Sequence, residues 1–163
     1  MLKILEDLVI LARERKSNPV EGSYTNKLLA DKSFAKEKVL EEINELIEAV
    51  EENSNKIHEA ADVFYHLLMY LEANNIKIDD VMSELEKRKK NPIEGSYTNK
   101  LLENKNLAKD KVLEEVNELI EAVEENTNKI HEAADVLYHL MMYLEANGVK
   151  IEEIMEELSA RKK

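Results

Sequence analysis

Two segments of the chain carry the same closely spaced acidic residues. KVLEEINELIEAVEENSNKIHEAADVFYHL begins at Lys38, and KVLEEVNELIEAVEENTNKIHEAADVLYHL begins at Lys111. Each segment contains an ExxE pair, then 13 intervening residues, then an ExxD pair. The eight acids are Glu42, Glu45, Glu59, Asp62, Glu115, Glu118, Glu132 and Asp135. Mg²⁺ and Mn²⁺ prefer oxygen ligands such as carboxylates to sulfur ligands, so the spacing is consistent with a metal site.

Helical periodicity sharpens this interpretation. At 100° per residue, Glu42 and Glu45 fall on the flank of the apolar face of one helix. Glu59 and Asp62 fall on a second helix that is apolar over more than half its circumference, which is typical of a buried helix. Carboxylates there are costly unless they are paired or bound to a cation. Acid-rich helices are also common without metal, and the periodicity by itself leaves both readings open.

Other polar residues of the second helix have simpler explanations. His66 and His139 lie one turn beyond the aspartates, where a supporting hydrogen bond or a core contact is favoured over direct ligation. His58, Tyr65 and Glu72 form a separate strip that we expect to face solvent. The methionines expected to serve in packing are Met69, Met82, Met141 and Met142.

A tandem repeat organises the whole chain. Residues 18–90 and 91–163 align at an offset of 73 with 55 identical positions and 18 differences. We therefore divide the chain into an N-terminal helix (1–17), repeat 1 (18–90) and repeat 2 (91–163). A single repeat of this size would struggle to bury enough surface alone, so we expect the two to form one compact domain.

The elements of each repeat follow from the apolar spacing and the turn residues. A short turn between two long helices predicts an antiparallel hairpin. The fold class is therefore all-α, a helical bundle with a four-helix core built from two antiparallel hairpins. The expected elements are a first helix at about 2–16, a loop of about 18 residues from Asn18, helices at about 36–52 and 56–74 joined by a turn at 53–55, and a third helix at about 78–90.

Composition excludes several functions. A formal net charge of −12 argues against nucleic acid as a partner, although an anionic small molecule could bind through a cation. There are 0 cysteines, which excludes disulfides and thiolate chemistry. No apolar run is long enough to span a membrane, and the amphipathic start is unlike a signal peptide, so a cytoplasmic location is expected.

Four stretches of sequence resemble a known family. These are EGSYTNKLL, KVLEEINE, HEAADVFYHLLMYL and DDVMSELEKRKK, and close copies of all four recur in repeat 2. They are similar to the phosphoribosyl-ATP pyrophosphohydrolases of histidine biosynthesis, within the all-α, MazG-like superfamily of nucleotide pyrophosphohydrolases. The ExxE and ExxD pairs are shared by the superfamily, whereas the SYxxKL and EAADxxYH stretches point to the histidine-pathway member.

The resemblance implies a site and a reaction. It makes the eight acids Mg²⁺ ligands and catalytic residues, with Mn²⁺ as a substitute. A metal-activated water would cleave phosphoribosyl-ATP between its α and β phosphates, giving phosphoribosyl-AMP and pyrophosphate. It also implies a pseudo-dimer in one chain, since the family forms homodimers; further self-association stays open. The residues grouped as substrate-binding are Tyr24, Lys27, Lys38, His66, Tyr97, Lys100, Lys111 and His139.

Three hypotheses remain open at this point. The first is an active phosphoribosyl-ATP pyrophosphohydrolase, and the second is a related enzyme acting on other nucleoside triphosphates. The third is a fused or redesigned helical scaffold without activity, which is favoured by Leu40 and Leu113 at positions where the family usually has glycine. Retention of all eight acids favours an enzyme, because replacing buried charges with apolar residues is often stabilising.

Overall fold

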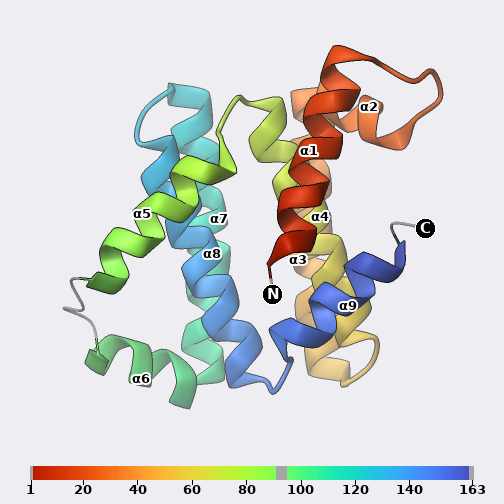
Figure 1. The fold of residues 1–163 in the computed structure, drawn as a ribbon. Helices are drawn as coiled ribbons and strands as arrows, with labels where there is room; N and C mark the ends of the chain where they lie inside the picture. The colour runs from red at the N-terminus through yellow and green to blue at the C-terminus, as the bar shows by residue number, and fades with distance from the viewer. Residues whose placement is uncertain (1, 91–94, 162–163) are drawn as a thin grey trace. The chain divides into compact units, whose positions relative to one another are not determined.

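The protein is an assembly of α-helices. The computed structural model describes residues 2–90 and 95–161, and every regular element within these ranges is helical, which confirms the all-α prediction (Figure 1). None of the described helices is long and apolar enough to cross a bilayer. The helices are α1 (Lys3–Ser17), α2 (Tyr24–Ala30), α3 (Lys32–Glu52), α4 (Lys56–Ala73), α5 (Ile78–Lys90), α6 (Gly95–Glu103), α7 (Lys105–Glu125), α8 (Lys129–Ala146) and α9 (Ile151–Arg161).

Each repeat is built on a helical hairpin, α3 with α4 and α7 with α8. The turn between α3 and α4 lies at 53–55, as predicted, and both Asn53 and Asn55 have positive φ, 55° and 52°. Asparagine tolerates this left-handed conformation better than most residues. The same geometry recurs at Asn126 and Asn128. Two asparagines thus reverse the chain within three residues and bring the two acidic pairs of a repeat onto neighbouring helices.

The predicted loop after Asn18 is wrong, because it contains a further helix. Helix α2 begins after Ser23, whose side chain accepts a hydrogen bond from the Asn26 amide. Helix α3 then begins at Lys32 instead of about residue 36, because Asp31 accepts a hydrogen bond from the Phe34 amide. Two N-caps so close together start two helices where polar composition alone suggested a loop. In repeat 2, residues 91–94 of the expected loop lie outside the described residues.

The chain divides into two compact units that do not follow the repeat boundaries. Unit 1 comprises Met1–Ile78 and Glu152–Lys163, and unit 2 comprises Asp79–Ile151. The last helix of each repeat therefore belongs with the hairpin of the other repeat: α9 lies in unit 1 and α5 in unit 2. The four-helix core across repeats and the single compact domain stay predictions.

Helix α4 forms the centre of unit 1. It packs against α3, α1 and α2, and its apolar residues are buried nearly all round, as its composition predicted. One part of the expected solvent-facing strip is wrong, because Glu72 is only 7% exposed. Arg13 of α1 pairs with it, its Nε lying 3.0 Å from Oε1 of Glu72. Helix α1, 59 residues earlier in the chain, thus covers a side of α4 that its own sequence marks as polar.

Candidate active site

The predicted acidic pairs converge across each hairpin. In unit 2, carboxylate oxygens of Glu115, Glu118 and Glu132 all lie within 4.8 Å of one another, although they come from α7 and α8. In unit 1, burial raises the pKa of Glu59 on α4, and the negative charges of Asp62 and of Glu45, which lies across the hairpin on α3, raise it further. Acids separated by 13 residues in the sequence are therefore neighbours in space, which is the arrangement that a shared cation requires.

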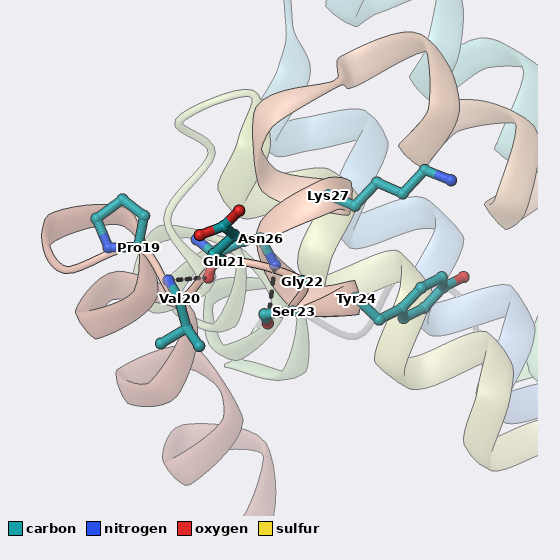
Figure 2. A pocket seen from close by; sticks show the side chains of 8 residues that line it. All are labelled: Pro19, Val20, Glu21, Gly22, Ser23, Tyr24, Asn26 and Lys27. Atoms are coloured by element: carbon teal, nitrogen blue, oxygen red, sulfur yellow. Dashed lines mark hydrogen bonds between the residues drawn. The ribbon is translucent and has the colours of Figure 1, made fainter.

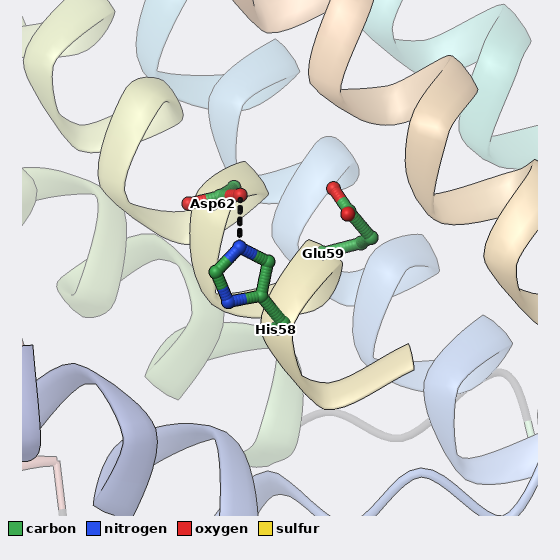
Figure 3. A group of neighbouring side chains, drawn as sticks. All are labelled: His58, Glu59 and Asp62. Atoms are coloured by element: carbon green, nitrogen blue, oxygen red, sulfur yellow. Dashed lines mark ion pairs between the residues drawn. The ribbon is translucent and has the colours of Figure 1, made fainter. Parts of the chain in front are cut away.

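Aspartate completes each group at the next turn. Figure 3 shows Asp62 beside His58 and Glu59 at the start of α4, with His58 Nε2 3.5 Å from Oδ2 of Asp62. One ligand atom from each of these three residues can be chosen within 4.8 Å of the others, and the same holds for the repeated group around Asp135. The aspartates are half-buried. Each group thus reaches the protein surface, so that a ligand in solution has access to it.

Four oxygens of the group are buried without a hydrogen-bond partner. They belong to Glu42, Glu59, Glu115 and Glu132, two in each unit, and each is an Oε2 atom. An unpaired buried polar atom costs free energy, and a buried carboxylate oxygen costs more than a neutral one. Native proteins leave few such atoms unsatisfied unless an ion or water completes them. The donor set therefore fits a hard, oxygen-preferring divalent cation such as Mg²⁺ or Mn²⁺.

The electrostatics of Glu42 agree with this fit. Burial is the largest cause that raises the pKa of Glu42 to about 7, and the negative charges of Asp62 and Glu45 raise it further. A hydrogen bond from Lys38 opposes the rise in the pKa. The pKa of the repeated residue, Glu115, is raised to about 7 for the same main reason. Crowded carboxylates without a counter-cation resist ionisation, and a bound cation would reverse this.

Lys38 is the one predicted substrate-binding lysine of unit 1 that contacts the acids. Its Nζ lies 3.3 Å from Oε1 of Glu42 and 3.0 Å from Oε2 of Glu41. Burial alone would lower the pKa of Lys38, but the hydrogen bonds to these glutamates outweigh it and raise the pKa. Lys111 repeats the contact with Glu115 at 3.3 Å. Each unit thus holds an ammonium group at the edge of its carboxylates.

His66 lies between the acids and α2. It is 6% exposed, its Nδ1 is 2.8 Å from the carbonyl oxygen of Asp62, and its Nε2 is 2.8 Å from the hydroxyl of Tyr24. Both ring nitrogens are therefore occupied within the protein. Burial lowers the pKa of His66, which favours the neutral ring. His139 and Tyr97 repeat the contact at 2.8 Å. This supports the expected hydrogen-bonding role for the histidines more than direct ligation.

Tyr24 and Lys27 extend on the same side of α2, away from Pro19 and Val20 (Figure 2). With residues 19–23 and Asn26, they line an open hollow of about 600 Å³. Lys27 is exposed, and its Nζ lies 4.4 Å from the ring centre of Phe34. Its repeat, Lys100, is also exposed, and Leu107 replaces the phenylalanine there. A cationic group beside an open hollow has the charge that a phosphate contact requires.

An arginine contacts each acidic group, and sequence reasoning missed it. Nη1 of Arg161 on α9 lies 2.5 Å from Oδ1 of Asp62, and Nη2 of the same arginine lies 2.8 Å from Nδ1 of His58. Arg88 of α5 makes the equivalent ion pair with Asp135 in unit 2. Each arginine comes from the repeat that does not supply the aspartate. The repeated arginines were visible in the sequence, but no spacing rule pairs residues 99 apart.

Comparison with known proteins gives the family. A family model described as phosphoribosyl-ATP pyrophosphohydrolase matches the chain twice, at residues 5–89 and 85–162. The chain belongs to this family. Two successive matches confirm the tandem duplication, and the prediction of a pyrophosphohydrolase is confirmed at the level of the family. No solved structure matches the chain.

Three individual relatives are identical to this chain at 39% to 41% of the aligned residues. The phosphoribosyl-ATP pyrophosphatase of Clostridium acetobutylicum is 39% identical over 106 residues, which are 63% of this chain and 96% of the relative. The protein of the same name from Methanococcoides burtonii is 39% identical over 93 residues, 54% of this chain and 94% of the relative. The histidine biosynthesis bifunctional protein HisIE of Pyrococcus furiosus is 41% identical over 92 residues. These residues are 55% of this chain and 43% of the relative.

Leu40 and Leu113 occupy the positions where the resemblance to the family led us to expect glycine. Leu40 and Leu113 stand two positions before Glu42 and Glu115, and both are half-buried. Neither disturbs the local helix: the side chain of Asn44 donates to the Leu40 carbonyl oxygen at 2.9 Å, and Asn117 does the same at Leu113. The convergence of the carboxylates is thus retained with leucine at these positions.

Proposed function

We propose that the protein hydrolyses phosphoribosyl-ATP to phosphoribosyl-AMP and pyrophosphate with Mg²⁺ bound at both acidic groups. The observation that carries the proposal is the pair of buried, unpartnered glutamate oxygens in each unit of a chain of this family. The relatives are named as enzymes of this reaction or of histidine biosynthesis, which supports the substrate and, with it, a cytoplasmic location.

The carboxylates have two tasks in this proposal. Glu42, Glu45, Glu59 and Asp62 would hold the cation in unit 1, and the corresponding acids would hold it in unit 2. A bound Mg²⁺ supplies charge neutralisation for the triphosphate and polarises the oxygens it contacts. One carboxylate of the group accepts the proton of the water that attacks between the α and β phosphates. No covalent intermediate is needed.

Cationic side chains at the edge of each group would bind the rest of the phosphate chain. Lys38 Nζ lies 3.3 Å from Oε1 of Glu42, so beside a bound cation its ammonium group would offset the negative charge of a leaving pyrophosphate. Lys27 extends on the same side of α2 as Tyr24, whose hydroxyl is fixed by His66. These residues supply charge offset and orientation, which are the main contributions of a protein to phosphoryl chemistry.

Pyrophosphate release tests the proposal. The protein is incubated with Mg²⁺ and phosphoribosyl-ATP, beside ATP and dUTP, and compared with the double variant Glu59→Gln/Glu132→Gln. We expect turnover of phosphoribosyl-ATP in preference to the other two nucleotides, and loss of about 10²-fold or more in the double variant, because each site loses a ligand.

The chain offers a matched control. Glu48 and Glu121 are exposed acids on α3 and α7, outside the acidic groups. Glu48→Gln/Glu121→Gln should therefore retain full turnover. Preferential turnover of ATP or dUTP would assign the protein to another nucleotide, and no turnover by a folded protein that binds Mg²⁺ would remove the catalytic proposal.

A further inference from the structure

Helix α1 covers one side of unit 1. It packs on α4 and α2, and its buried residues are Ile4, Leu5, Leu8, Val9 and Ala12. Near its C-terminal end, Nε of Arg13 donates to Oε1 of Glu72 at 3.0 Å and Nζ of Lys16 donates to the Glu72 carbonyl oxygen at 2.5 Å. The contact thus combines an apolar stripe with two basic residues near the C-terminal end of α1, which bind Glu72 in the last turn of α4.

Unit 2 repeats this side of the hairpin with less cover. Six residues of α2 and α4 are buried in unit 1 while the repeated residues of unit 2 are more exposed. We call the unit 2 set the exposed face; it consists of Thr98, Leu102, Met141, Met142, Glu145 and Ala146. Met69 is 0% exposed and Glu72 7%, whereas Met142 is half-buried and Glu145 is exposed.

Residue type does not explain the difference between the units. Five of the six positions are identical in the two repeats, and the sixth exchanges Leu68 for Met141. The helix that precedes repeat 2 in the sequence, α5, docks differently from α1. Arg15 of α1 aligns with Arg88 of α5, but Arg15 donates to Ser23 at 2.8 Å whereas Arg88 pairs with Asp135 in the first turns of α8. Within the described residues, Arg88 of α5 therefore contacts the start of α8, whereas Arg15 of α1 contacts the residue that caps α2.

We propose that the exposed face of unit 2 binds an amphipathic helix of the same chemistry as α1, supplied by another polypeptide. Such a helix would carry apolar residues at positions i, i+1, i+4, i+5 and i+8 and a basic residue at i+9, as Ile4 to Arg13 do. The apolar residues would cover Met141 and Met142, whose unbranched side chains adapt to different partners. The basic residue would pair with Glu145, as Arg13 pairs with Glu72. The inference is independent of the enzymatic activity.

A peptide with the sequence of residues 1–17 is the direct probe. Labelled with a fluorophore and blocked at both ends, it is titrated with the full-length protein while anisotropy is followed. We expect saturable binding to one site per chain, because the intramolecular α1 occupies unit 1. The peptide variant Arg13→Glu should bind about five- to tenfold more weakly, since a charge-assisted contact to Glu145 becomes repulsive.

Charge exchange makes the test specific. Glu145→Arg in the full-length protein should weaken the unmodified peptide by a similar factor and restore binding of the Arg13→Glu peptide. Glu121→Arg, at an exposed position of α7, serves as a control and should change neither affinity. Circular dichroism of each variant confirms that the helices remain folded.

Three results would overturn the proposal. The first is the absence of saturable binding up to about 1 mM peptide, the weak limit of specific recognition. The second is concentration-dependent self-association of the chain that Glu145→Arg abolishes and the peptide does not compete, which would assign the face to a second copy. Binding that is insensitive to both charge changes also contradicts the assigned contact.

Discussion

Replacing the most buried glutamate of each acidic group should stabilise the metal-free protein. Glu42 is 5% exposed with one oxygen unpartnered, and its pKa rises from 4.5 to about 7. Ionising such a group in the folded state costs about 3 kcal/mol at high pH. This cost already includes the favourable contact with Lys38, and solvent screening reduces it, so we expect glutamine to give a net gain of about 1–2 kcal/mol per site. The same reasoning applies to Glu115.

Thermal unfolding at pH 8 measures this effect. In EDTA, Glu42→Gln/Glu115→Gln should raise Tm by on the order of 5–10 °C, because about 1 kcal/mol shifts Tm by 2–4 °C in a chain of this size. With saturating Mg²⁺ the order should reverse, since the parent gains binding free energy that the variant has largely lost. The measurement in EDTA therefore reports the cost of the buried charge, and the measurement in Mg²⁺ reports its contribution to cation binding.

A control on the same helices decides how the result is interpreted. Glu41 and Glu114 also contact the lysines, but their side chains are 52% exposed. Glu41→Gln/Glu114→Gln should change stability by less than about 0.5 kcal/mol in EDTA. If Glu42→Gln/Glu115→Gln instead destabilises the metal-free protein at pH 8, the ion pairs with Lys38 and Lys111 outweigh burial, and the argument that these carboxylates are retained for a cation is refuted.

Three further predictions use the same assays. The folded-state pKa of the two buried glutamates is raised above 4.5 to about 7. Their stabilising contribution is therefore complete below about pH 4.5 and is lost as the pH rises through 7. Tm in EDTA should fall as the pH rises through this window, and Tm in Mg²⁺ should fall much less. Arg88→Gln/Arg161→Gln should lower Tm in EDTA by about 2–4 °C and enlarge the Mg²⁺-induced rise, since guanidinium and cation compete for the aspartates; an unchanged Mg²⁺ response would contradict this competition. Asn53→Ala should cost about 1 kcal/mol at the left-handed turn and Asn53→Gly much less, as urea unfolding can measure.

Much of the fold followed from local patterns. Helix periodicity and the turn residues predicted the all-α class, the hairpins and the position of the turn. A turn of only three residues makes the second helix run antiparallel beside the first. The short helix α2 was missed for a related reason. Its two caps, Ser23 and Asp31, are polar residues that equally suit a loop, and the apolar residues between them are too few to show a period.

The acidic residues were predictable, but their partners were not. Placing Glu59 and Asp62 on an apolar helix identified a costly arrangement from one helix alone. The contact of Glu72 with Arg13 and that of Asp62 with Arg161 join residues 59 and 99 apart, and they depend on how helices dock. A helical wheel considers one helix, so it assigns a polar strip to solvent. It cannot show that a second helix packs there and pairs a charged residue with the strip.

The docking of the last helices has a consequence for the acidic groups. Two nearly identical repeats could each have folded their third helix onto their own hairpin, yet α9 lies with repeat 1 and α5 with repeat 2. Each aspartate therefore takes its guanidinium partner from the other repeat, at 2.5 Å in the case of Asp62 and Arg161. An isolated repeat would hold all four carboxylates of one group but not this arrangement of its arginine. The duplication thus does more than double the number of groups, because each repeat supplies the other with the cation that neutralises its aspartate when no metal is bound.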